Sequence, residues 1–150
     1  MPDYNEFFKN ILKETEKMST CARLHVAAVI VKDGRIVSTG WNGVPSKQSH
    51  CSDIFYKQDV NKNILSYADH HKFSNNNEIH AEQNAIGFAS RNGVSTKNSD
   101  IYLSISPCIY CSKLISASGI KNVFYISEYD REKEGINFLK KNNIKCEELK

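Results

Sequence analysis

Long apolar runs are absent from this sequence. No segment approaches the roughly 18 consecutive apolar residues that a membrane-spanning helix requires. The first residues, MPDYNEFFKNILKE, interleave acids and lysines with apolar side chains, so they lack the uninterrupted apolar core of a secretory signal peptide. We therefore expect no membrane partner and a cytoplasmic location.

A strong excess of one charge is also absent. The 20 Lys and Arg residues against 17 Asp and Glu give a formal net charge of +3, and the lysines are scattered without forming a basic arm. This balance permits an anionic small-molecule substrate and argues against a nucleic-acid partner. The chain has no repeat or low-complexity segment, and its 150 residues suit one domain that spans 1–150.

Cysteine, by contrast, is present at five positions: Cys21, Cys51, Cys108, Cys111 and Cys146. In a reducing compartment, cysteines are more often metal ligands, catalytic groups or buried thiols than disulfides. Cys146 lies in a short terminal strand pattern without a partner for metal binding, so we interpret it as a core thiol.

Alternating helical and strand patterns predict the fold class. Residues 4–18 have apolar side chains at helical spacing, and HVAAVIVKDGRIVSTGW contains two apolar runs joined by the hairpin signal Asp33-Gly34. This order predicts an α/β sandwich with a partly parallel sheet. The remaining expected elements are strands at DIYLSIS, NVFYIS and IKCEEL, and helices from about His80 to Arg91, from Ser106-Pro107 to Gly119, and over REKEGINFLKKN.

Between residues 42 and 77 the sequence is polar and irregular, with no sustained apolar period. We therefore predict a long loop there. A loop of this length inside a compact domain is usually functional or disordered. Its cluster of His50, Cys51, His70 and His71 favours a function.

Two short motifs carry the strongest chemical signal. His80 and Glu82 lie in NEIHAEQNAIG, and Cys108 and Cys111 are the two cysteines of SPCIYC. Each pair opens a predicted helix, whose positive N-terminal end favours the thiolate form of cysteine. Two cysteines on one helical turn and a neutral histidine can hold a tetrahedral zinc ion with one position open to water. We predict that His80, Cys108 and Cys111 bind a catalytic zinc.

Glu82 has a separate predicted role beside that zinc. Zinc lowers the pKa of a bound water, which can then attack an electrophilic ring carbon. Protons must move from the water to the ring nitrogen and the departing amine, and a nearby carboxylate such as Glu82 can carry them. Taken alone, Cys-x-x-Cys could be a redox pair or half of a structural zinc site, and His-x-Glu a solvated helix start. Together they match the zinc-deaminase signature H-x-E followed by P-C-x-x-C.

These motifs resemble those of the cytidine and deoxycytidylate deaminases. The resemblance runs from about Cys21 to Cys146 and includes VAAVIVKDGRIVSTGWNG, HAEQNA, SPCIYC and GIKNVFYISEYD. It implies a three-layer α/β/α sandwich around a five-stranded mixed sheet, in agreement with the element order predicted above.

Within that family, HAEQNA and GWNG before a long insertion look most like the deoxycytidylate branch. The resemblance implies zinc-dependent hydrolysis of dCMP to dUMP and ammonia, which supplies thymidylate synthesis. It also implies that Asn42 and Asn84 contact the sugar and phosphate, that Tyr129 covers the base or phosphate, and that Arg23 pairs with the phosphate. The simpler interpretations are a turn at Asn42-Gly43 and a surface charge at Arg23.

The resemblance also implies a second, structural zinc that clips the insertion at about 42–78. A metal clip would offset part of the entropy lost when a long polar loop becomes ordered. The simpler interpretation treats the cysteines as buried thiols, and His50 and His71 are rival ligands. The implied ligands are Cys21, Cys51, His70 and Glu78.

Regulation is a further implication. GFASRNG resembles the segment with which allosteric members of this branch contact dCTP or dTTP, with Phe88 and Arg91 at the matching positions. Such members are homo-oligomers, with hexamers favoured, and a Mg²⁺ ion could accompany the nucleotide effector. Phe88 could instead be a helix core residue and Arg91 a helix-end cation.

Two alternative functions are consistent with parts of the pattern. One is a deaminase acting on cytosine or adenine within nucleic acid, which would need a basic, aromatic-lined groove that the dispersed lysines and tyrosines do not predict. The other is a non-enzymatic nucleotide sensor with a deaminase fold. Glu82 argues against the sensor, because a structural zinc site has no use for a proton carrier.

Overall fold

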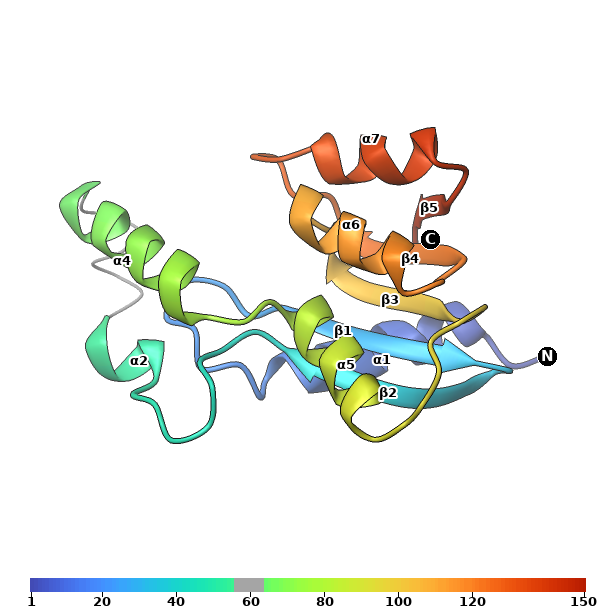
Figure 1. Ribbon diagram of the computed structural model, residues 1–150, viewed down its shortest axis with the longest axis horizontal. Helices are drawn as coiled ribbons and strands as arrows, with labels where there is room; N and C mark the ends of the chain where they lie inside the picture. Colours follow the sequence, from blue (N-terminus) through green and yellow to red (C-terminus); the bar gives the residue numbers. More distant parts are fainter. Residues whose placement is uncertain (56–63) are drawn as a thin grey trace.

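The computed structural model describes residues 1–55 and 64–150 of the chain (Figure 1). Helices and strands alternate along most of the sequence, as the sequence patterns predict. The elements are α1 (Tyr4–Glu16), β1 (Ala27–Lys32), β2 (Arg35–Trp41), α2 (Cys51–Ile54), α4 (Ile64–Asn77), α5 (Ala81–Arg91), β3 (Asp100–Ile105), α6 (Ile109–Ala117), β4 (Asn122–Ser127), α7 (Glu134–Lys141) and β5 (Lys145–Glu148).

The strands form one mixed five-stranded sheet in the order β2-β1-β3-β4-β5. β1 pairs antiparallel with both β2 and β3, whereas β3, β4 and β5 are parallel. The β1–β2 hairpin turns at Asp33 and Gly34, whose φ angles of 52° and 73° are those that a tight two-residue hairpin turn requires. The predicted mixed sheet is confirmed.

Helices cover both faces of this sheet and make three layers. The side chains of β1 alternate between the faces. Ala28 and Ile30 pack in a cluster with α5, α6 and α7, whereas Val29 and Val31 pack with α1 through Phe8 and Leu12. Cys146 is buried in the first cluster, which confirms its interpretation as a core thiol.

The segment predicted as a long loop is partly helical. α2 and the 14-residue α4 project from one end of the sheet (Figure 1). Sequence periodicity did not indicate α4, because ILSYADHHKFSNNN has no apolar stripe. Among the described residues, no helix is both long and apolar enough to cross a membrane.

The start of α6 also differs from the prediction, which placed Pro107 on its first turn. The helix begins at Ile109, and Cys108 is its N-cap with an extended backbone (φ −71°, ψ 170°). The Cys108 Sγ atom accepts a hydrogen bond from the Cys111 backbone N–H at 3.4 Å. A sulfur cap therefore fixes the helix start two residues after the proline.

Candidate active site and metal centres

The candidate active site lies where α5 and α6 begin, beyond the carboxyl end of β3. His80 is the N-cap of α5, and Cys108 is the N-cap of α6, three residues after β3 ends. Ahead of His80, Ile79 forms an isolated β-bridge with Gly43, with N–H to O distances of 2.8 and 3.1 Å. Both helix starts are therefore fixed by backbone structure.

His80, Cys108 and Cys111 converge as the sequence predicts. The His80 Nδ1 atom lies 3.6 Å from the Cys108 Sγ atom and 3.3 Å from the Cys111 Sγ atom. Tetrahedral zinc with Zn–S near 2.3 Å and Zn–N near 2.0 Å places its ligand atoms roughly 3.5 Å apart. The three donors thus fit a zinc ion with a fourth position left for a non-protein ligand.

The local electrostatics prepare these thiols for metal binding. A hydrogen bond with Cys111 lowers the pKa of Cys108 to about 4, and His80 contributes in the same direction. The same hydrogen bond and burial raise the pKa of Cys111. A bound metal ion would favour the thiolate form of both cysteines.

Glu82 lies next to this centre without belonging to the three-donor group. Its side chain lines the cavity described below, yet the residue is only 4% exposed. Burial raises the pKa of the Glu82 carboxyl, while its own backbone N–H and the charge of His80 act to lower it. A carboxyl group whose pKa is raised keeps a proton more readily and is suited to proton transfer.

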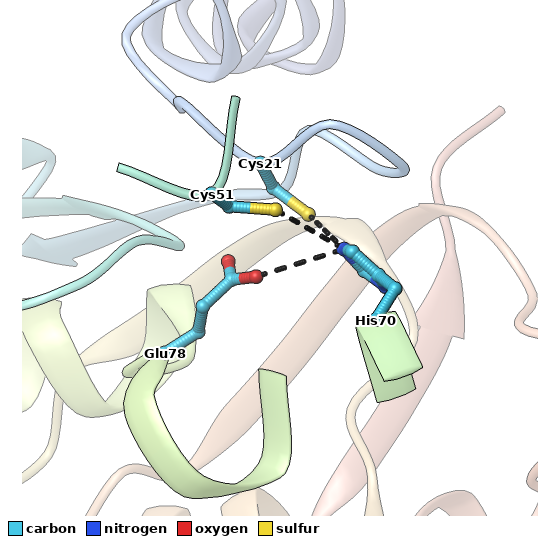
Figure 2. A group of neighbouring side chains, drawn as sticks. All are labelled: Cys21, Cys51, His70 and Glu78. Carbon is cyan, nitrogen blue, oxygen red and sulfur yellow. Dashed lines mark hydrogen bonds and ion pairs between the residues drawn. The ribbon is translucent and has the colours of Figure 1, made fainter. Parts of the chain in front are cut away.

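A second donor group forms where α2 and α4 meet the segment before β1. Figure 2 shows Cys21, Cys51, His70 and Glu78 pointing toward one another. The His70 Nε2 atom lies 3.6 Å from the Cys21 Sγ atom, 3.2 Å from the Cys51 Sγ atom and 3.8 Å from the Glu78 Oε1 atom. One atom from each residue lies within 4.8 Å of all the others, and all four residues are buried.

The chemistry of this second group fits a metal ion. Both carboxylate oxygens of Glu78 are buried without a hydrogen-bond partner among the described residues, an arrangement that costs free energy unless a cation is bound. Burial raises the pKa of Glu78 to about 7, and a hydrogen bond from Cys51 lowers the pKa of Cys21 to about 4. Four protein donors close the coordination shell, as in structural zinc sites.

Among the three histidines predicted as alternatives, His70 is the one in this group. His50 is instead the N-cap of α2 and lies 3.2 Å from the Thr20 hydroxyl through its Nδ1 atom. His71 is exposed and stacks on Tyr67. The adjacent positions 70 and 71 differ because successive helical residues point about 100° apart.

A cavity of about 420 Å³ joins the catalytic donors to α4. One face of α4 and the residue just after it form part of the wall, at three- and four-residue spacing. This face is polar, so α4 has no apolar stripe to detect in the sequence. Its members are Tyr67, His70, His71, Ser74, Asn75 and Glu78.

Three of the four predicted substrate residues line this cavity: Asn42, Tyr129 and Arg23. The Asn42 amide is largely engaged, since its Oδ1 accepts from Ser19 and Val26 and its Nδ2 donates to the Leu24 carbonyl. One N–H of that amide is left for a ligand.

Asn84, the fourth predicted substrate residue, lies outside the cavity lining. Its Nδ2 atom donates to the Trp41 carbonyl at 2.7 Å and ties α5 to the end of β2. Its contact with a nucleotide stays a prediction.

Sequence reasoning missed Tyr67 and Arg131 at the mouth of the cavity. The Tyr67 ring lies beneath two guanidinium groups, with Arg23 at 5.3 Å and Arg131 at 4.9 Å from its centroid. Arg131 also donates to the Tyr67 hydroxyl. The arginine in YDRE lies two residues after Tyr129, and this proximity was the only sequence signal available.

Phe88 and Arg91 lie on the outer surface of α5, outside the cavity lining. Phe88 is 47% exposed, which excludes its alternative interpretation as a core residue of this chain. The Arg91 guanidinium lies 5.1 Å from the Phe88 ring centroid.

Known proteins resemble this chain in sequence and in fold. Residues 1–127 match the cytidine and deoxycytidylate deaminase zinc-binding region. The deoxycytidylate deaminase of Enterobacteria phage T4 is 38% identical over 143 residues, covering 78% of this chain and 74% of that protein. ComE operon protein 2 of Bacillus subtilis is 37% identical over 126 residues, covering 84% of this chain and 60% of that protein.

A solved structure extends the likeness to the whole fold. The dCMP deaminase of cyanophage S-TIM5, in complex with dCMP and dUMP, superposes with a TM-score of 0.80 at 30% identity and covers 99% of this chain and 98% of its own. Sequence match, fold and the His80, Cys108 and Cys111 geometry agree. The chain therefore belongs to the zinc-binding cytidine and deoxycytidylate deaminase family.

Proposed function

We propose that this protein hydrolyses dCMP to dUMP and ammonia and thereby supplies dUMP for thymidylate synthesis. The observation that carries the proposal is the three-donor centre of His80, Cys108 and Cys111 beside the buried carboxyl of Glu82, at the base of a nucleotide-sized cavity. The likeness to the T4 and S-TIM5 deaminases supports dCMP as the substrate.

Each residue of the catalytic centre has a distinct role in this proposal. His80, Cys108 and Cys111 would hold a zinc ion, whose Lewis acidity would activate a water for attack on the ring carbon that bears the amino group. Glu82 accepts one proton from that water and passes it to the neighbouring ring nitrogen. It then accepts the second proton, from the oxygen added to the ring carbon, and delivers it to the departing amine. The overall change consumes one water and releases one ammonia for each dCMP.

The two arginines at the cavity mouth favour a substrate with a phosphate group. Arg23 and Arg131 are far apart in the sequence, yet both contact the Tyr67 ring. Two guanidinium groups at one opening attract a dianion and can bind it through paired hydrogen bonds. Tyr129 also lines the cavity and can cover the bound nucleotide.

We further propose that residues 1–150 form a single domain. In it, a structural zinc held by Cys21, Cys51, His70 and Glu78 clips the insertion at about 42–78 to the rest of the domain. The insertion includes residues 56–63, which lie outside the described part of the chain. His70 belongs to α4 and Glu78 follows it directly, so a metal here would fix the helix that walls the cavity.

Regulation by dCTP or dTTP at Phe88 and Arg91, with Mg²⁺ accompanying the effector, also belongs to this proposal. The exposure of both residues on α5 is compatible with a site outside the catalytic cavity. Assembly into a homo-oligomer, with a hexamer favoured, and a cytoplasmic location stay predictions.

A substrate panel tests the proposed activity. Ammonia release should be fastest with dCMP when it is compared with dCTP, deoxycytidine, cytidine and a tRNA anticodon stem, each measured with and without dCTP or dTTP as effector. Preference for the monophosphate over deoxycytidine would support a phosphate-binding role for the arginines. Turnover of the RNA alone would overturn the proposal.

A further inference from the structure

The Glu132 side chain connects two helices at the edge of the catalytic centre. Its Oε1 atom accepts the backbone N–H of Ile109 at 2.8 Å, and its Oε2 atom accepts the N–H of Gly135 at 3.3 Å. Ile109 is the first residue of α6, and Gly135 lies in the first turn of α7. Because both N–H groups lack partners within their own helices, one carboxylate satisfies an unpaired donor at each helix start.

The position of Gly135 shows how closely the start of α7 approaches the Pro107–Cys108 turn before α6. A Cβ atom added at Gly135 would lie 2.1 Å from the Pro107 carbonyl oxygen and 2.8 Å from that of Cys108. No side chain of any size fits there without moving the backbone. The start of α7 therefore lies directly against the turn that carries the first cysteine ligand.

Residues 127–135 are also bonded to the turn at residues 106–109 by their first residues. The Tyr129 backbone N–H donates to the Ser106 hydroxyl at 2.7 Å, and the Ser106 N–H donates to the Ser127 carbonyl at 2.9 Å. Residues 127–135 are thus bonded to residues 106–109 on both sides of Tyr129 and Arg131, the two cavity-lining residues of this segment that the proposed function uses.

We propose that Glu132 is a positioning residue for substrate binding, because it sets the distance between the metal-ligating turn and the segment that carries Tyr129 and Arg131. The inference rests on the proposed function, in which these two residues contact the nucleotide. Glu132 also lines the cavity, but in this inference it acts through its backbone partners and needs no contact with the nucleotide.

Loss of this carboxylate should affect the two sides of the connection unequally. On one side, Cys108 keeps its own cap contact with Cys111 and shares a three-donor centre with His80. On the other side, residues 128–131 belong to neither of the two donor groups. The nucleotide-contacting segment should therefore shift while the catalytic centre keeps its geometry, so that KM changes and kcat does not.

The test compares Glu132→Ala with Glu128→Ala on zinc-loaded protein. Glu128 lies in the same segment and is exposed, and it forms a 3.9 Å ion pair with Lys133. Glu132→Ala should raise the KM for dCMP about tenfold while kcat stays within about threefold, as expected from the loss of charge-assisted hydrogen bonds. Glu128→Ala should leave both constants near the wild-type values, although it removes the same charge.

Glu132→Gln provides a second, milder variant. Its amide oxygen can still accept from Ile109, but its NH₂ group would face the Gly135 N–H, so the rise in KM should be intermediate. Hydrogen exchange adds a readout that does not require activity: amides 128–131 should exchange faster in Glu132→Ala than in Glu128→Ala.

Three results would overturn the inference: an unchanged KM in both Glu132 variants, an equal rise in Glu128→Ala, or unchanged exchange in residues 128–131. Absence of dCMP turnover by the wild-type protein would instead count against the proposed function. In that case the exchange measurement still decides whether Glu132 holds the segment.

Discussion

Glu82 lines the cavity although the residue is only 4% exposed. Its position two residues after His80 on the first turn of α5 keeps it beside the metal donors without making it one of them. Burial raises its pKa, and the positive end of the helix limits that rise. The raised pKa favours the protonated carboxyl, the form that can give a proton to a ligand in the cavity.

Replacement of Glu82 by Gln should sharply lower kcat while leaving the metal centre intact. The expected fall in kcat is roughly 10³- to 10⁴-fold, because the amide cannot accept or return the proton. Zinc per chain should equal that of the wild type, as measured by atomic emission on the same samples. Glu134→Gln, which changes an exposed carboxylate at the start of α7, is the matched control and should retain full activity. Near-wild-type turnover in Glu82→Gln would remove the proton-carrying role.

Site residues that belong to short motifs could be predicted from the sequence. Site residues that come together only through the fold could not. His80, Cys108 and Cys111 follow from local spacing at two helix starts, and the structure brings their donor atoms together. Arg131 and Tyr67 are 64 positions apart and meet only because α4 lies over the loop after β4. No local pattern encodes that contact.

Among the elements, α4 shows why periodicity failed in one segment and succeeded in the others. α1 and α7 bury apolar faces against the sheet, and their spacing predicts them. α4 turns a polar face toward the cavity and contributes His70 to the second donor group, so its sequence carries no apolar stripe. A search for histidine, tyrosine and asparagine at helical spacing would have detected this face.

The packing of α5 on β2 depends on Gly40. A Cβ atom at Gly40 would lie 2.3 Å from the Ala81 carbonyl oxygen and 2.5 Å from the Ala85 nitrogen. We expect Gly40→Ala to lower the free energy of unfolding by about 2–4 kcal/mol and the Tm by roughly 5–15 °C, because backbone atoms must separate. Activity should fall as well, since α5 carries Glu82 and begins directly after His80. Calorimetry and a dCMP assay on the same samples measure both effects.

Gly87→Ala is the control for that substitution. Gly87 lies on the exposed side of α5, and a Cβ atom there meets nothing within 4 Å. Alanine should stabilise the helix by about 0.5–1 kcal/mol through its higher helix propensity. Equal stability of the two variants would show that Gly40 does not set the spacing between helix and sheet.

At the scale of the whole molecule, the hydrophobic core and the insertion are stabilised differently. Two large apolar clusters hold the sheet between its helices. The insertion packs on the segment before β1 through a small cluster, in which two of the three buried members, Cys21 and Cys51, also belong to the second donor group. Removal of metal should therefore loosen the insertion first, because little apolar burial remains to hold it.

Chelation combined with hydrogen exchange tests this separation. After zinc removal, amides of α4 should exchange much faster, whereas amides of β1 and β3 should stay protected because their strands are buried on both faces. Cys51→Ala should reproduce the effect on α4 without a chelator and should lower zinc by one ion per chain. Cys146→Ala removes a buried thiol from the main core instead and should leave both the zinc content and α4 exchange unchanged. Uniform loss of protection across α4 and the sheet would mean that the chain unfolds as one unit and that the second metal has no separate role.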